Sequence, residues 1–357
     1  KNHSPKMRLQ ELSFLTFFSR ILGLIREMVK SRVLGTSPLA DAFTVSFLIP
    51  NLLRRLFAEN SMTVAFIPTF KELIEKKEDE TQKEKERREF LSSIFTILTF
   101  FTTIIVVLGI LFTPLILHLL FPHLEDRASA ILLTRIMFPY LIFISIAAFF
   151  QGILNGIKVF SPSGFTPILF NISVIGTTYI LAIPSGNYAI AMSIGVLIGG
   201  FLQAMFQLPF VLKHKFFFSF TSLKKALCNT YTKKTLRLIA PTIIGMAAYQ
   251  INDLVSTSLA TGYGIGIASS LQYSLRLQEL LLGVFVVSIS SVILPDLSSY
   301  AIKTDWSSFE NLFLTSMKII ALITIPASFF AFFSSEEIVS IIYKSNKFDS
   351  NSVKLTT

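Results

Sequence analysis

The sequence predicts an all-α fold, a polytopic membrane helix bundle with two pseudo-symmetric lobes around a central cavity. Composition is the first observation behind this prediction. Of the 357 residues, 52% are hydrophobic and only 15% are charged, a balance too apolar for a soluble domain of this length. The second observation is that apolar runs long enough to cross a hydrocarbon core of ~30 Å recur along the whole chain. We therefore expect about nine spans.

The nine predicted spans are separated by polar connections. They cover residues 12–35, 40–70, 91–121, 129–155, 165–184, 188–212, 237–261, 267–297 and 311–333. Several exceed the ~20 residues that a span needs, so we expect tilt, kinks or protrusion into water. The first span is expected to act as its own insertion signal, because no short apolar segment typical of a cleavable signal peptide precedes it. After the polar residues 344–357 we expect further spans of a longer protein.

Lysine and arginine are distributed unequally between alternate connections. The run at 71–89 and the cluster at 213–236 are rich in them, whereas the connections at 36–39, 184–187 and 262–266 contain none. By the positive-inside rule, the rich connections and the N-terminus are cytoplasmic. The formal net charge of +10 then follows from topology and from basic residues within the spans, so nucleic acid is not needed as a partner.

A faint internal repeat predicts the two lobes. Spans two and eight share four positions in an ungapped alignment, in which Ala40, Leu52, Leu53 and Phe57 face Ala268, Leu280, Leu281 and Phe285. Chance agreement between apolar helices is the alternative. A duplicated unit of six helices would give an N-terminal lobe at 1–212 and the start of a C-terminal lobe at 237–357. The segment 213–236 mixes Phe with Lys and is expected to be a cytoplasmic amphipathic linker on the membrane surface.

Basic side chains interrupt the apolar runs and predict an anion site in the cavity. Charge at bilayer depth is costly and usually faces a water-filled space. A guanidinium stays charged and presents a planar fork that suits phosphate oxygens. We expect this role for Arg20, Arg26, Arg54 and Arg276. The alternative, a long side chain that reaches the headgroups from a helix end, is expected for Lys30 and Arg32.

Polar residues beside these arginines are expected to bind the uncharged parts of the same substrate. They are Ser19, Asn51, Gln272 and Glu279. Gln272, Arg276 and Glu279 share one helix face at i, i+4 and i+7.

Five further residues are expected to form ion pairs or gates. Glu27 shares a helix face with Arg20, and Arg55 is spaced to pair with Glu59, although both Arg54 and Arg55 could be structural. Pro50 lacks a backbone donor and predicts a kink in span two. Asp41 is expected either to close an outer gate by pairing with a basic residue of the other lobe or to cap its own helix.

Enzymatic motifs are absent from the sequence. It contains no Walker A loop, no GxSxG and no HExxH, so a membrane enzyme is disfavoured and no cofactor is expected. Cys228 is the single cysteine, which excludes an intrachain disulfide.

Several segments closely resemble the MurJ/MviN lipid II flippases. The segments are SRILGLIRE (19–27), LADAF (39–43), PNLLRRLFAE (50–59), AFIPTF (65–70), GILNGIKVFSPSGFTPILFN (152–171) and ILPDLS (293–298). The resemblance implies a multi-pass protein of the bacterial inner membrane in the multidrug/oligosaccharidyl-lipid/polysaccharide exporter superfamily. Such a protein would act as a monomer among membrane lipids. It would carry lipid II, the undecaprenyl-pyrophosphate-linked peptidoglycan precursor, to the periplasmic leaflet by alternating access. The alternative is an exporter of another lipid-linked oligosaccharide or of drugs within that superfamily.

Two positions depart from the family pattern. Leu275 stands where the family commonly has Asp before the span-eight arginine, so Glu279 is the candidate replacement as its partner. Ser256 falls at the position of an acid that binds sodium in some members, and Asp253 lies one turn earlier. These two residues are the sodium candidates, and coupling to the membrane potential is the alternative.

Overall fold

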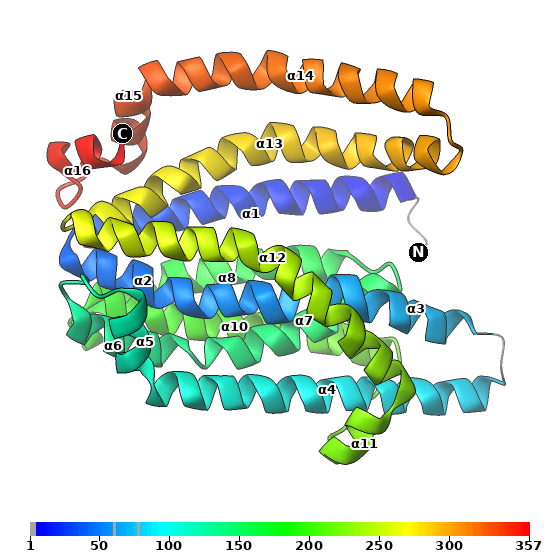
Figure 1. Cartoon of the computed structure of the whole chain (residues 1–357). Helices are drawn as coiled ribbons and strands as arrows, with labels where there is room; N and C mark the ends of the chain where they lie inside the picture. Colours follow the sequence, from blue (N-terminus) through cyan, green and yellow to red (C-terminus); the bar gives the residue numbers. More distant parts are fainter. Residues whose placement is uncertain (1–4, 60–61, 77–78) are drawn as a thin grey trace.

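The computed structural model describes residues 5–59, 62–76 and 79–357, and every regular element in these ranges is a helix. Most of the helices run along a common direction (Figure 1). The first ten α-helices and two π-helical segments are α1 (Pro5–Leu34), α2 (Pro38–Leu53), η1 (Arg54–Glu59), η2 (Met62–Phe66), α3 (Ile67–Glu75), α4 (Glu80–Leu111), α5 (Thr113–Leu120), α6 (Arg127–Met137), α7 (Tyr140–Gly156), α8 (Ser161–Ile180), α9 (Ala182–Ser185) and α10 (Tyr188–Lys213). The others are α11 (Leu223–Cys228), α12 (Thr230–Tyr263), α13 (Ile267–Ile302), α14 (Trp306–Phe333), α15 (Ser335–Tyr343) and α16 (Ser350–Thr356).

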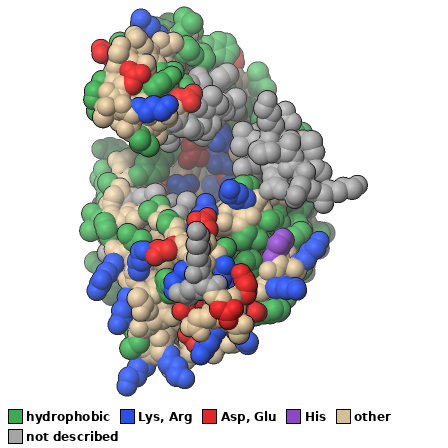
Figure 2. All heavy atoms as spheres, turned by 90° about the vertical axis from the view of Figure 1, so that its right-hand side faces the viewer, with side chains coloured by type: hydrophobic (Ala, Val, Ile, Leu, Met, Phe, Trp, Pro, Cys, Tyr) green, Lys and Arg blue, Asp and Glu red, His purple; other side chains and the backbone are tan. Residues whose placement is uncertain are grey.

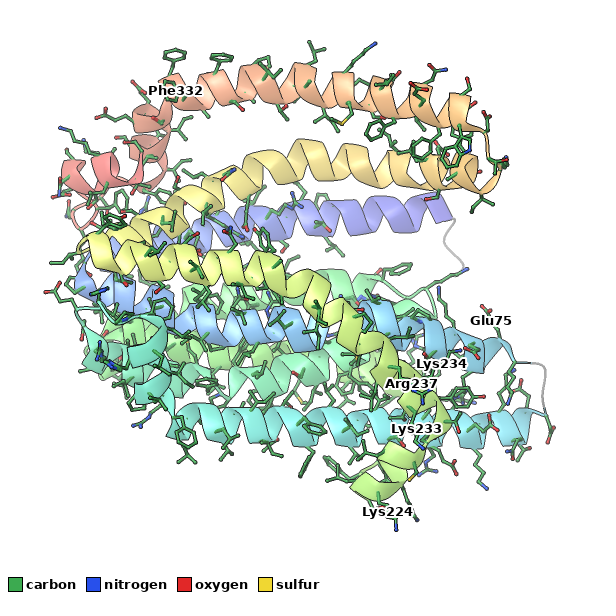
Figure 3. All side chains as sticks on the ribbon, in the orientation of Figure 1. Glu75, Lys224, Lys233, Lys234, Arg237 and Phe332 are labelled. Carbon is green, nitrogen blue, oxygen red and sulfur yellow. The ribbon has the colours of Figure 1, made fainter. Side chains whose placement is uncertain are left out.

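Large apolar side chains cover the outside of the bundle. Leu111 on α4 is 63% exposed, and Phe332 on α14, labelled in Figure 3, is 77% exposed. Water would penalise so much exposed apolar surface, whereas lipid accepts it. In the described ranges, four helical stretches are long and apolar enough to cross a bilayer: Glu80–Leu111, Arg127–Gly156, Tyr188–Lys213 and Trp306–Phe333. The bent α12 is a fifth if its two parts form one span. The chain is a multi-pass membrane protein.

The count of nine spans stays a prediction. Within the part of the chain that the structure describes, α1, α2, α8 and α13 do not meet the same criteria of length and composition. The reason is visible in α1, which carries two arginines, a glutamate and a lysine between positions 20 and 30. In α2, the regular helix stops after 16 residues and continues as π-helix. These helices line the cavity described below, so their polar residues lower the mean hydropathy.

The connections between helices lie at two opposite ends of the bundle (Figure 1). One end, here called the inner end, holds the start of α1, the end of α3, the start of α4, α11 and the α13–α14 connection. The outer end holds the α1–α2, α5–α6 and α12–α13 connections together with α9. Figure 3 places Lys224 of α11, and Lys233 and Lys234 near the start of α12, at the inner end. The connections rich in basic residues thus lie together and away from those without them.

This arrangement predicts that the two ends face opposite sides of the membrane. In a Cys228→Ser background, cysteines introduced at the exposed Glu84 and at Gly186 should react with an impermeant thiol reagent from opposite sides. Labelling of both positions in intact cells would contradict the predicted topology.

Buried apolar side chains of the described residues form two separate clusters. The larger cluster is built from buried residues between 33 and 216, and the smaller one joins α13, α15 and α16 around Tyr273 and Tyr343. The segment after α10 runs along α4, where the backbone N–H groups of Ser219 and Thr221 donate to the hydroxyls of Ser92 and Thr96, each over 3.0 Å. The next long helix starts at Thr230, within the segment 213–236 predicted to be a linker, and the division of the chain into two lobes and a linker stays a prediction.

Pro50 lies inside α2, one turn before the helix changes to the π-helical segment η1. A proline lacks the N–H that the regular helix would use, which weakens the helical ladder at this point. We expect Pro50→Ala to favour a continuous α-helix and to slow severalfold the export that the sequence resemblance implies, while the protein still inserts into the membrane. Transport rate and the amount of protein in the membrane fraction measure the two effects. An unchanged rate would remove Pro50 from the mechanism.

Candidate functional site

A cavity of about 640 Å³ lies between the helices of both halves of the chain. Side chains from α1, α2, η1, α7, α8, α10, α12 and α13 line it. All eight residues predicted to bind substrate are among them: Ser19, Arg20, Arg26, Asn51, Arg54, Gln272, Arg276 and Glu279. Figure 2, viewed from the inner end, shows a hollow with basic and acidic side chains in its depth.

The α1 side of the cavity carries a connected row of charges. The guanidinium of Arg26 pairs with the Glu27 carboxylate at 2.7 Å and donates to Asn171 Oδ1 on α8 at 3.2 Å. It also lies 5.5 Å from the centre of the Phe170 ring. Because Arg26 is held on several sides, its position is set before any substrate binds.

Lys30 contradicts the prediction that it reaches the lipid headgroups. Its side chain is buried and lines the cavity, where Nζ donates to Thr44 Oγ1 at 2.9 Å and lies 3.8 Å from Glu27 Oε2. The ammonium is also 4.7 Å from the centre of the Tyr273 ring. The prediction was wrong because the position of Lys30 along the helix shows only how near it is to the membrane edge. It does not show which side chains take the place of water around the ammonium.

Arginines on η1 and α13 reach the cavity from two other directions. Arg54 donates through Nε and Nη2 to Asn51 Oδ1, over 3.0 and 2.9 Å. Arg276 pairs with Glu279 at 3.0 Å, one turn along α13. Arg55 also lines the cavity, whereas the side chain of its predicted partner Glu59 lies outside the described part of the chain.

Positive charge is in excess in the cavity. Among the residues that the structure describes, six basic residues line the cavity against three acids, Glu27, Asp253 and Glu279. Arg20 has no acid within ion-pair distance among the residues that the structure describes. An unpaired guanidinium in a partly buried cavity is a ready ligand for an anion, and several together suit a diphosphate.

At the outer end, Asp41 joins α2 to the start of α13. Its carboxylate accepts hydrogen bonds from the backbone N–H of Gly266 at 2.6 Å and from that of Ser269 at 2.7 Å. Asp41 makes neither of the two interactions expected from the sequence. Within the described chain it forms no ion pair with a basic residue, and the residue that caps α2 is Ser37. The first amides of a helix lack internal acceptors and carry partial positive charge, so they attract a carboxylate.

Further contacts close the outer end between the two halves. Tyr273 donates to the carbonyl of Gly35 at 3.1 Å, and Lys347 Nζ donates to the carbonyl of Val33 at 3.0 Å. Gly266 has φ +80°, and a Cβ there would lie 2.4 Å from the Thr36 carbonyl oxygen. The α1–α2 turn is therefore held tightly against α13 and the α15–α16 connection.

Asn171 is a site residue that the sequence reasoning missed. It is buried on α8, accepts from Arg26, and donates through Nδ2 to the Ser19 carbonyl at 3.3 Å. An amide within the apolar run 165–184 was the available signal, because a buried polar side chain in a span requires a partner.

Comparison with known proteins decides the family. The family described as "Lipid II flippase MurJ" matches residues 30–357. A curated relative from Treponema pallidum (strain Nichols), "Probable lipid II flippase MurJ", is 53% identical over 97% of this chain. The chain belongs to the MurJ lipid II flippase family. It spans 65% of the length of that relative.

Solved structures agree with the MurJ assignment. A structure titled "Lipid II flippase MurJ, inward closed conformation" matches with a TM-score of 0.80 and 30% identity, over 97% of this chain and 70% of the other. An inward-facing multidrug resistance MATE family transporter of the MOP superfamily matches with a TM-score of 0.70 and 13% identity, over 98% of this chain and 80% of the other. At 13% identity, the second likeness shows that this chain shares its fold with that transporter.

Proposed function

We propose that this chain translocates lipid II from the cytoplasmic to the periplasmic leaflet of the bacterial inner membrane by alternating access. The observation that carries the proposal is that residues from both halves, Arg20, Arg26, Arg54 and Arg276, line one cavity with an excess of positive charge. A pyrophosphate between sugars and a lipid tail is the anion that such a cavity would bind. The family name of the relatives supports this choice of substrate.

The geometry suggests the order of events. With the N-terminus in the cytoplasm, the hollow in Figure 2 faces the cytoplasm, and the contacts of Asp41 close the periplasmic side. The headgroup would enter from the cytoplasmic leaflet and bind the arginines. The Asp41 contacts would then break as the two halves rock apart at the outer end. Within the described residues, the arginines of the cavity come from both halves of one chain, and we propose that the monomer is functional among its membrane lipids.

Coupling to an ion stays a prediction. Asp253 Oδ1 accepts from Gln272 Nε2 at 3.0 Å, and the same amide nitrogen lies 3.0 Å from Thr257 Oγ1. Ser256 lines the same side of the cavity. Among the described residues, no group of three His, Cys, Asp or Glu side chains could hold a metal ion. Asp253 and Ser256 stay the sodium candidates, coupling to the membrane potential stays the alternative, and no other cofactor is proposed.

The test is complementation of a flippase-depleted strain together with an assay of lipid II exposed on the periplasmic side. Lipid II should become exposed only when the protein is present. Binding of lipid II and of an unrelated cationic drug, compared by native mass spectrometry, separates this proposal from a drug exporter. Preference for the drug would contradict it, as would conversion of labelled lipid II into a new chemical species.

A further inference from the structure

Gly23 of α1 is the point at which the Arg276 side chain of α13 touches α1. Gly23 is buried, and a Cβ built on it would lie 2.3 Å from Arg276 Nη2 and 3.5 Å from Cζ. Real Cβ atoms essentially never approach a neighbour within 3.0 Å. The guanidinium therefore occupies the space that any other residue at position 23 would fill with its own side chain.

The backbone of α1 does not itself require glycine here. Position 23 lies in the middle of a 30-residue helix, and Gly23 is not among the residues with positive φ. In a helix interior, glycine is less favourable than alanine by about 1 kcal/mol. Because the backbone conformation does not require glycine, we explain Gly23 by the volume that its missing side chain leaves open.

That space lies on the charged face of α1. Gly23 follows Arg20 by three residues and precedes Glu27 by four, so the three positions share one face of the helix. Arg276 is held at its other nitrogen, since Nη1 donates to Glu279 at 3.0 Å. Glu279 on one side and the bare backbone of Gly23 on the other thus hold the guanidinium against the charged face of α1.

We propose that Gly23 is a positioning residue for substrate binding, which lets Arg276 cross from α13 to α1 and join the anion site. This inference rests on the proposed function. A methyl group at position 23 would push away the far end of a flexible side chain, so the helix would stay intact while the guanidinium moved. The effect of Gly23→Ala should therefore depend on Arg276.

The experiment is a double-mutant cycle on the full chain, with Gly23→Ala, Arg276→Ala and the double variant. We expect each single variant to weaken lipid II binding by about tenfold, and the double variant to bind no more weakly than Arg276→Ala alone. The matched control is Gly176→Ala, because Gly176 is also helical and a Cβ added to it would meet no atom within 4 Å. The control should bind as the parent does, and neither glycine variant should lower the melting temperature.

A second measurement needs no substrate. Phenylglyoxal modifies accessible arginines, and peptide mapping should show faster modification of Arg276 in Gly23→Ala than in the parent or in Gly176→Ala. Equal modification, or additive losses of binding in the cycle, would overturn the positioning role. If the parent fails to bind lipid II while the modification rate still rises, the proposed substrate is wrong and the placement of Arg276 by Gly23 stands.

Discussion

Arg20→Ala should weaken lipid II binding by roughly tenfold or more and should fail to support growth of a flippase-depleted strain. Arg20 lines the cavity without an acidic partner among the described residues, so its charge is available to a ligand. A charge-assisted hydrogen bond contributes about 1.5–3 kcal/mol, less where water screens it, and 1.4 kcal/mol corresponds to tenfold in affinity. Little folding stability should be lost, because no ion pair is broken.

The other three arginines of the cavity allow the loss of binding to be compared with the loss of folding stability. Arg26, Arg54 and Arg276 each hold a neighbouring polar side chain, so their alanine variants should lose binding and some stability together. Arg20→Lys keeps the charge but loses the planar fork, and should retain part of the affinity.

Lys85→Ala is the matched control for these variants. Lys85 is exposed near the start of α4, whereas Lys76 in the same charged run pairs with Glu86 at 3.3 Å and would be a poorer choice. If all four arginine-to-alanine variants bind lipid II and complement like the parent, the arginines are structural and the cavity is not a pyrophosphate site.

Asp41→Ala should open the outer end. The substitution removes the acceptor of two buried backbone N–H groups, a loss of about 1–3 kcal/mol, which shifts the ratio of outer-closed to outer-open protein by roughly tenfold to a hundredfold. Asp41→Asn keeps one acceptor oxygen and should shift the ratio less. The measurement is the rate at which a cysteine at Phe47, which lines the cavity, reacts with an impermeant reagent from the periplasmic side.

Asp305→Ala is the matched control for the Asp41→Ala variant. Asp305 also caps a helix, since it accepts from the backbone N–H of Ser308 at 3.1 Å, but it does so within its own helix at the inner end. It should leave the labelling rate at Phe47→Cys unchanged. Equal labelling rates in Asp41→Ala and in the parent would show that Asp41 does not hold the outer end closed.

The membrane class, the family resemblance and the arginines that line the cavity could all be predicted from the sequence. Each of these depends on the apolar surface or the charge of individual side chains, which are the same in any fold. A run of apolar side chains must leave water wherever the chain folds, and an arginine within such a run must find a polar space. For this reason Arg20, Arg54 and Arg276 could be assigned to one cavity although they lie on helices far apart in the sequence.

The atoms that these and other polar residues contact could be known only from the packing of the helices. Asp41 binds the backbone N–H of Gly266, 225 residues later in the chain, and backbone amides carry no sequence signature. Lys30 is buried because Thr44 and the Tyr273 ring replace its water, and Gly23 matters through the side chain that fills its empty space. The composition of a helix determines that its charges must be satisfied, whereas the packing of distant helices determines which atoms satisfy them.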